Sequence, residues 1–167
     1  TTGLRANELL SLNWGSFRYN RQGYLYVDVI GKGNKPRTIP VKEETEQLLF
    51  KYRKSLGESV EIDTGDVSPL FFSLYNRTDL LQHKKRLTYP SLYKIVKEAV
   101  QLAGRQSQVS PHWFRHTFVT MMLENDVPLA IVKDMAGHSD ISTTNIYLER
   151  INQDNTHVHL QKVNMFR

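Results

Sequence analysis

Apolar and polar residues alternate along this chain with two periods, that of a helix and that of a strand. Residues 2–12 carry leucines at helical intervals, which predicts a short helix that begins at Thr2 or Gly3. Arg5 and Glu8 are three positions apart in this segment and would share one face of the helix. The first predicted element therefore presents a charged pair.

A small antiparallel sheet is predicted next. Residues 24–30 and 37–41 are rich in β-branched and aromatic residues and flank the glycine-containing stretch 31–36, a pattern typical of two strands joined by a turn. A further short strand is expected near residues 15–18. The sheet would thus have three strands inside a mostly helical chain.

The remaining residues predict helices joined by polar loops. Helices are expected over residues 42–56, 88–103, 111–124 and 128–136, the last ending at Gly137, and then over a pair of turns ending at Tyr147. Loops are expected over residues 57–69 and 76–86, around a brief buried segment at 70–72. The expected inner faces of the first three helices are Leu48, Leu49, Tyr52 and Leu56; Leu92, Ile95, Val96, Ala99 and Val100; and Phe114, Phe118, Met121 and Met122.

Length and composition fit a single α+β domain, mostly α-helical with a small three-stranded antiparallel sheet. The chain has 167 residues, 40% of them hydrophobic, which suffices for one core. Its net charge of +5 and pI near 9.4 favour an anionic partner such as nucleic acid. The chain has no cysteine and no apolar run near the roughly 20 residues of a membrane span, so an intracellular protein without disulfides is expected.

The polar residues of the C-terminal half suggest phosphoryl transfer. His112 and Arg115 are three positions apart on a predicted helix, so both would face outward toward one ligand. Fixed guanidinium and imidazole donors stabilise the charge that builds on phosphate oxygens. Tyr147 would supply a nucleophile that keeps the bond energy in a covalent link, provided that the site helps to remove a proton whose pKa is about 10 in free tyrosine.

These residues, in this order, resemble the tyrosine recombinase or phage integrase family. The matching motifs span nearly the whole chain: Thr2-Gly3-Leu4-Arg5 with Glu8, Gly31-Lys32-Gly33-Asn34-Lys35, His112-Trp113-Phe114-Arg115-His116-Thr117, and Gly137-His138-Ser139 with Thr143, Thr144 and Tyr147. The resemblance implies a tyrosine recombinase (DNA breaking-rejoining enzyme) catalytic-domain fold. It also implies a site-specific DNA recombinase that cleaves and rejoins strands through a 3′-phosphotyrosyl intermediate, with no metal or other cofactor.

The resemblance implies a catalytic role for most of the matching residues. Arg5 and Arg115 would clamp the scissile phosphate, and His138 would hydrogen-bond to it. Tyr147 would be the nucleophile. Glu8 would support an arginine or histidine rather than take part in the chemistry.

Other residues of the matching motifs would transfer protons. His112 would be the acid/base partner, and Lys32 would protonate the 5′ leaving oxygen, with Lys35 as the competing candidate. A structural role is favoured for His116, because one helical step from the arginine places it on another face. Trp113 would either pack in the core or brace the site.

Expectations for the whole protein also come from the resemblance. Residues 1–167 are expected to be a catalytic domain that lacks its N-terminal start and an upstream core-DNA-binding domain. The partner would be double-stranded DNA, bound by a homotetramer on paired sites at full length, whereas this fragment would be a monomer. A cytoplasmic, nucleoid-associated location is expected. The tail at residues 149–167 would either exchange between protomers or fold onto its own domain, and Tyr147 would act in its own site or a neighbour's.

Three other functions are compatible with parts of this pattern. The family chemistry also fits strand relaxation of the type IB topoisomerase kind, and a DNA-binding module without catalysis would keep the same basic face. His112, His116 and His138 would be the ligands of a zinc hydrolase, but Arg115 between two of them would repel a dication and Trp113 replaces a catalytic Glu.

Overall fold

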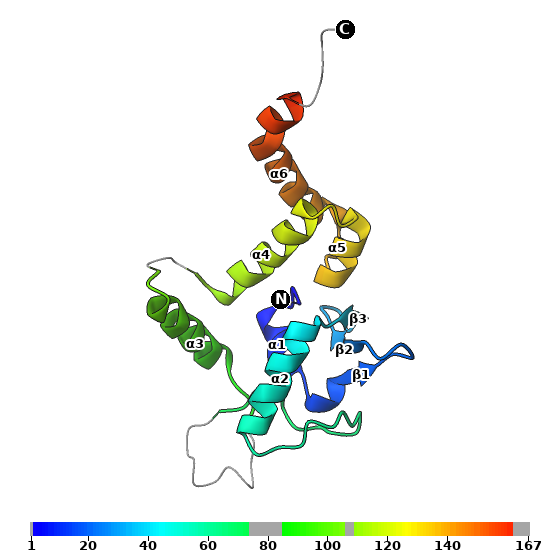
Figure 1. Ribbon diagram of the computed structural model, residues 1–167, viewed down its shortest axis with the longest axis vertical. Helices are drawn as coiled ribbons and strands as arrows, with labels where there is room; N and C mark the ends of the chain where they lie inside the picture. Colours follow the sequence, from blue (N-terminus) through cyan, green and yellow to red (C-terminus); the bar gives the residue numbers. More distant parts are fainter. Residues whose placement is uncertain (1, 74–84, 106–108, 162–167) are drawn as a thin grey trace.

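The computed structural model describes residues 2–73, 85–105 and 109–161, and it confirms a mostly helical α+β fold with one small sheet. Figure 1 shows the arrangement. The elements are α1 (Ala6–Ser11), the 3₁₀ turn η1 (Trp14–Ser16), β1 (Phe17–Tyr19), β2 (Leu25–Ile30), β3 (Pro36–Pro40), α2 (Glu43–Ser55), α3 (Tyr89–Leu102), α4 (Pro111–Glu124), α5 (Leu129–Ala136) and α6 (Ile141–Gln161).

The sheet is the predicted antiparallel one, with strand order β1-β2-β3. Phe17 pairs with Val27, which in turn pairs with Ile39, so the central strand β2 holds the other two. Alternate residues of β2, Leu25, Val27 and Val29, are buried, because successive side chains of a strand point to opposite faces. The sheet is therefore covered on one face.

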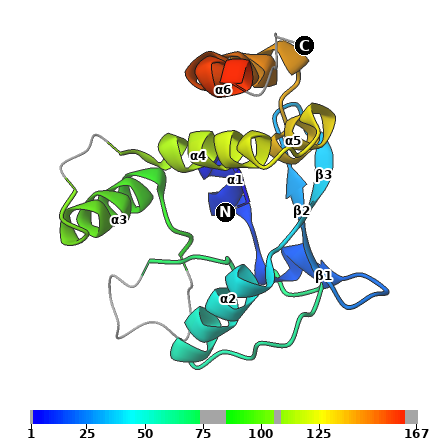
Figure 2. The same cartoon turned by 45° about the horizontal axis from the view of Figure 1, so that its top comes forward.

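Two apolar cores lie on either side of the region where α1, β3 and the end of α5 meet. The first is built on the sheet and η1 and includes Trp14 and Leu70. The second lies among α4, α5 and α6 and includes Val119, Val132 and Ala136. In Figure 2, α4 lies between α6 on one side and α1 on the other, and α5 lies beside β3. At this junction the side chains of Glu8 on α1 and Arg37 on β3 meet each other, and Arg37 also reaches the backbone carbonyl of Met135 on α5.

Helix α1 begins later than predicted. Arg5, not Thr2 or Gly3, is its N-cap, and the Arg5 backbone N–H donates to the Glu8 carboxylate at 2.8 Å. Gly3 has φ +65, outside helical geometry, and a Cβ at this position would lie 2.3 Å from the Phe118 ring. The sequence lacked this information because the constraint comes from α4.

The predicted inner face of α4 is wrong in two of its four positions. Phe114 and Met121 are each 55% exposed, whereas Arg115, Val119 and Leu123 are buried. These three residues share one stripe of the helix at intervals of four. Arg115 therefore faces the interior, and the expectation that His112 and Arg115 face outward together holds only for His112.

The inner faces of α2 and α3 also differ from prediction. Leu48 is 66% exposed because α2 instead buries Arg53, whose guanidinium lies 4.2 Å from the centroid of the Trp14 ring and bonds to Asp66. Helix α3 has no buried residue, and Ile95 on its predicted stripe is 50% exposed. Both helices are amphipathic, but tertiary packing uses less of their apolar surface than the pattern suggests.

The C-terminal helix is longer than predicted. Instead of ending at Tyr147, α6 continues to Gln161 and extends away from the sheet in Figure 1. Both expectations for the tail depend on side chains from residue 153 onward, which lie outside the described residues, as does most of the loop predicted at 76–86. In the described ranges, no helix has both the length and the apolar character that crossing a membrane requires.

Candidate active site

Five of the six residues that the sequence predicts to be catalytic line one pocket of about 350 Å³. Its lining consists of Arg5, His112, Arg115, His116, His138, Thr143, Ile146 and Tyr147. These residues come from the start of α1, the N-terminal half of α4, the α5–α6 turn and α6. The sixth nominated residue, Lys32, lines two further pockets that share Arg5 with this one.

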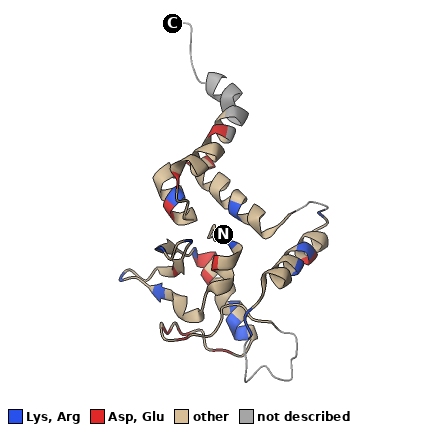
Figure 3. Cartoon of the chain, turned by 180° about the vertical axis from the view of Figure 1, so that it is seen from behind, with Lys and Arg blue, Asp and Glu red and all other residues tan. Residues whose placement is uncertain are grey.

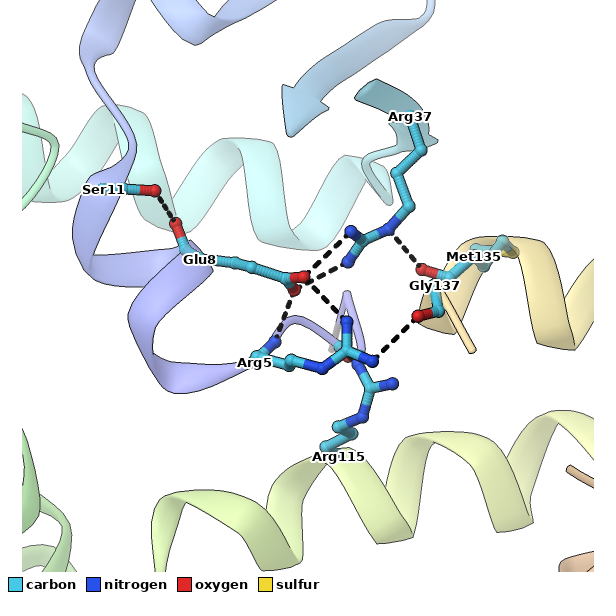
Figure 4. Close-up of polar contacts among 8 residues, drawn as sticks. Arg5, Glu8, Ser11, Arg37, Arg115, Met135 and Gly137 are labelled. Atoms are coloured by element: carbon cyan, nitrogen blue, oxygen red, sulfur yellow. Dashed lines mark hydrogen bonds and ion pairs between the residues drawn. The ribbon is translucent and has the colours of Figure 1, made fainter. Parts of the chain in front are cut away.

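A network of charge-assisted hydrogen bonds organises one wall of the pocket (Figure 4). Glu8 accepts from Arg5 Nη1 at 2.9 Å and from both Nη1 and Nη2 of Arg37, at 3.0 and 2.7 Å. Arg5 Nη2 also donates to the Gly137 carbonyl at 2.8 Å, and Arg37 Nε donates to the Met135 carbonyl at 3.1 Å. The network joins α1, β3 and the C-terminal end of α5.

Glu8 is the centre of this network rather than half of a surface ion pair. Burial would raise the pKa of the Glu8 carboxyl, but hydrogen bonds from Arg37 and Arg5 outweigh it and lower the pKa overall. The carboxylate is thus ionised at neutral pH and holds two guanidiniums of like charge close together. The contact with Arg5 favours the supporting role expected from the sequence, which stays a prediction.

Arg37 is a member of the site that the sequence analysis did not nominate. Its side chain is largely buried, and a Cβ on Gly137 would lie 2.8 Å from its Cζ atom. A signal was present, because Arg37 is two positions from the buried Ile39 on β3 and therefore lies on the inward face of the strand. A charged residue at such a position needs a buried partner, which Glu8 supplies.

Loss of the Arg37–Glu8 pair is expected to destabilise the fold strongly. The Arg37→Met variant should lower the free energy of unfolding by about 3 kcal/mol, because it leaves Glu8 buried with fewer donors. Urea unfolding at neutral pH measures this, with Arg18→Met as control, since Arg18 pairs with Asp28 on the exposed side of the sheet. Similar losses in both variants would contradict a special role for the buried pair.

Arg115 is buried with unused hydrogen-bonding capacity. Its Nη1 donates to the Gly3 carbonyl at 2.6 Å, whereas its Nη2, also buried, has no partner among the described residues. Burial, followed by repulsion from Arg5, lowers the pKa of Arg115 to about 10. The guanidinium nevertheless remains charged at neutral pH, so the pocket holds a cation with a free donor.

His138 is neutral in the absence of a ligand. Its Nδ1 bonds to the Oγ1 atom of the buried Thr144 at 2.8 Å. Burial, then the nearby charges of Arg115 and Arg5, lower the pKa of His138 to about 4. An anion in the pocket would offset the repulsion and favour the imidazolium.

This pKa shift predicts a loss of stability on mild acidification. Between the unperturbed value of 6.5 and about 4, the unfolded chain binds a proton at His138 that the native chain does not. The free energy of unfolding should therefore fall as the pH drops through this window. Urea unfolding from pH 7 to pH 4.5 should show a weaker decline for His138→Asn, and an equal decline in both proteins would contradict the assignment.

The phenol of Tyr147 contacts a histidine that was assigned a structural role on sequence grounds. Its hydroxyl is hydrogen-bonded to Nδ1 of His116, and the two ring centroids are 5.3 Å apart. His112, the nominated acid/base residue, lies edge-on to His116 at 4.3 Å and is exposed. The expectation that His116 faces elsewhere was wrong, because residues 112 and 116 are one turn apart and share the face that meets α6.

Comparison with known proteins establishes the family. Residues 1–153 match the model of the phage integrase family. The chain belongs to this family. It is 36% identical over 146 residues to the tyrosine recombinase XerD of Oceanobacillus iheyensis, and 30% identical over 166 residues to the tyrosine recombinase XerC of Pediococcus pentosaceus. These alignments cover 87% and 97% of this chain but 46% and 48% of the relatives, so the chain spans about half their length.

Solved structures agree with this phage integrase assignment. The XerH site-specific recombinase bound to its difH substrate is similar at a TM-score of 0.68 and 28% identity, over 88% of this chain and 39% of that one. The XerA recombinase gives the same score and identity, over 92% of this chain and 52% of that one. The predicted tyrosine recombinase catalytic-domain fold is confirmed.

The phage integrase motifs seen in the sequence thus occupy one region of the fold. The β2–β3 turn places Lys32 in pockets with both His112 and His138, whereas Lys35 lines only the second of these. Trp113, left open between core and site, is 56% exposed and belongs to neither core. Ala136, directly before Gly137, is buried in the core of α4, α5 and α6.

Proposed function

We propose that this chain is the catalytic domain of a site-specific DNA recombinase that cleaves and rejoins DNA strands through a 3′-phosphotyrosyl intermediate. The observation that carries the proposal is the buried Arg115, whose Nη2 has no partner among the described residues and which shares a pocket with the phenol of Tyr147. A buried cation with a free donor is costly unless an anion completes it. A backbone phosphate is the anion that a nucleophilic tyrosine would attack.

Three donors would hold the phosphate. Arg115 and Arg5 would bind its non-bridging oxygens. His138, whose Nδ1 is engaged by Thr144, would donate from Nε2, and the phosphate charge would favour the protonated ring. Glu8 and Arg37 fix Arg5 before DNA binds. Such a preorganised set stabilises charge in the transition state without rearranging during the reaction.

The reaction exchanges one phosphoester for another. The Tyr147 hydroxyl oxygen forms a bond to phosphorus and loses its proton, while the bond from phosphorus to the 5′ oxygen breaks. Lys32 would protonate that oxygen, since it is the lysine that shares pockets with both His112 and His138. A 5′-hydroxyl of another strand later attacks the phosphotyrosine, so no external energy source or metal is required.

Double-stranded DNA is the proposed partner. A second pocket of about 720 Å³ beside the first is lined by basic side chains, including Lys32, Lys35, Arg37 and Lys133. The basic side chains of this pocket would neutralise the phosphates that border the cleaved one. Figure 3 shows that Lys and Arg also occur on other elements of the chain. The similar XerH site-specific recombinase is bound to its difH substrate.

For the whole protein we propose assembly as a homotetramer on paired DNA sites in a bacterial cytoplasm. Recombination requires two duplexes, each cleaved by one protomer per strand, so four active sites would be present. A two-site recombination assay beside a plasmid relaxation assay distinguishes this activity from strand relaxation by a lone protomer. Relaxation without recombination would favour the topoisomerase-like alternative.

The test of the chemistry is capture of a covalent product. The whole protein is incubated with fragmented DNA of its own organism, denatured, and recovered with any DNA that remains attached, which is then sequenced. We expect one recurrent sequence joined through its 3′ end to Tyr147. Absence of denaturation-resistant DNA would reject the function, and stoichiometric zinc in the purified protein would favour the hydrolase.

A further inference from the structure

We propose that His116 accepts the proton of the Tyr147 hydroxyl as that residue attacks the phosphate. The inference rests on the proposed function of Tyr147 and adds a catalytic residue to it. The contact that motivates it is the hydrogen bond between the Tyr147 hydroxyl and Nδ1 of His116, in a pocket that Arg5 and Arg115 also line.

His116 and Tyr147 come from two different helices that pack against each other. His116 lies in the N-terminal half of α4, and Tyr147 lies two turns into α6, which packs along α4 through Val119, Leu148 and Ile151. Because these apolar contacts fix the two helices, the imidazole and the phenol are held in reach before DNA arrives. His116 is half-buried, which limits competition from water for its ring nitrogen.

The other two imidazoles of the pocket are less suited to this role. His138 has Nδ1 engaged by Thr144, and its low pKa makes it a weak base until an anion is bound. Its remaining nitrogen is needed for the phosphate. His112 is exposed and contacts the ring of His116, at a centroid distance of 4.3 Å. It would therefore assist His116 rather than accept the proton of the phenol directly.

The proposed step is balanced. In cleavage, the Tyr147 oxygen bonds to phosphorus while its proton moves to the lone pair of His116 Nδ1, which gives an imidazolium. The 5′ oxygen leaves with a proton from Lys32. In rejoining, a 5′-hydroxyl attacks phosphorus and gives its proton back to Lys32, the bond from phosphorus to the Tyr147 oxygen breaks, and the proton on Nδ1 returns to the phenolate. The step requires that neutral His116 carry its hydrogen on Nε2, since only an unprotonated Nδ1 can accept.

The groups facing His116 come from every element around the pocket. His112 and Arg115 lie on its own helix, Arg5 precedes α1, His138 lies between α5 and α6, and Tyr147 lies on α6. All of them except the phenol are cationic or able to become so. A phosphate entering this pocket would therefore stabilise the imidazolium at the moment it forms.

The deciding experiment measures single-turnover cleavage of the captured DNA site by the whole protein. The key variant is His116→Asn, whose side-chain oxygen can accept a hydrogen bond near the position of Nδ1 but cannot take up a proton. We expect cleavage to slow by about 100-fold or more, the scale of a lost general base, with DNA binding changed less than about twofold. Thr117→Asn, at the next and exposed position of α4, is the matched control and should cleave like the native protein.

A second substrate separates the base from the acid. Sulfur in place of the 5′ bridging oxygen gives a leaving group that needs no proton, so Lys32→Ala should be rescued on it whereas His116→Asn should not. Cleavage by His116→Asn within threefold of the native rate, or rescue by sulfur, would overturn the proposal. Failure of the native protein to form any adduct would instead remove the proposed function itself.

A measurement on the native protein covers the case in which His116→Asn does not fold. Nitrogen NMR of the histidine rings should show His116 as the Nε2–H form, with an Nδ1 signal that changes in Tyr147→Phe. A ring protonated on Nδ1 in the neutral form would exclude it as the acceptor.

Discussion

Tyr147→Phe is expected to abolish the denaturation-resistant protein–DNA product completely. The substitution removes one oxygen atom, the one that is hydrogen-bonded to His116 in the pocket that Arg5 and Arg115 line. Binding of the uncleaved DNA site should be retained, because Arg5, Arg115 and His138 are unchanged. Gel electrophoresis after denaturation measures the adduct, and band shift under native conditions measures binding.

The control for this experiment is a tyrosine outside the pocket. Tyr19 lies on β1 with its hydroxyl bonded to Glu46, so Tyr19→Phe removes the same atom far from the site and should form adduct normally. Folding should be little affected in either variant, since one lost hydrogen bond costs about 1 kcal/mol. An adduct that persists in Tyr147→Phe would mean that another residue is the nucleophile.

Arg115→Met should separate catalysis from stability. We expect cleavage to fall by at least about 100-fold, the scale for removing one preorganised charge donor. We also expect the free energy of unfolding to stay the same or rise, because the variant replaces a buried cation that is repelled by Arg5 and has an unsatisfied Nη2 with an apolar side chain of similar length. Single-turnover cleavage and urea unfolding measure the two effects.

A fall in cleavage without a fall in the free energy of unfolding would indicate that Arg115 serves to bind an anion rather than to stabilise the fold. Arg18→Met, on the exposed side of the sheet, should alter neither. A large loss of stability in Arg115→Met would show that the hydrogen bond to the Gly3 carbonyl outweighs the cost of burial. Nearly normal cleavage would remove Arg115 from the site.

Local features of the fold were predictable because they depend on neighbours in sequence. The turn between β2 and β3 follows from its glycines, and the end of α5 follows from Gly137, which has the left-handed conformation with φ +67. Five of the six nominated catalytic residues line one pocket, and the sixth lines its neighbours. Residue type and order were enough to name these candidates, because each motif lies within a single helix, turn or helix end.

The errors concern side chains whose environment is set by distant elements. Phe114 is a better core residue than Arg115 by hydrophobicity alone, yet α4 buries Arg115 because the Gly3 carbonyl and Glu8 lie on that side. His116 was assigned to another face because its partner, Tyr147, comes from a helix 31 residues further along the chain. Helical periodicity gives the stripes of a helix but does not say which stripe meets which neighbour.

The sequence by itself determined most of the elements, the family resemblance and a set of candidate catalytic residues, since these depend on local periodicity and residue type. Tertiary structure alone decided that Arg37 joins α1 to α5 through Glu8, and that His116 meets the phenol. It also decided that Arg115 is buried with an Nη2 that has no partner in the part of the chain that the structure describes. The physical reason is that burial, charge repulsion and hydrogen-bond partnership are properties of pairs. The members of these pairs are up to 112 positions apart, and only the packing of α1, β3, α4, α5 and α6 brings them within bonding distance.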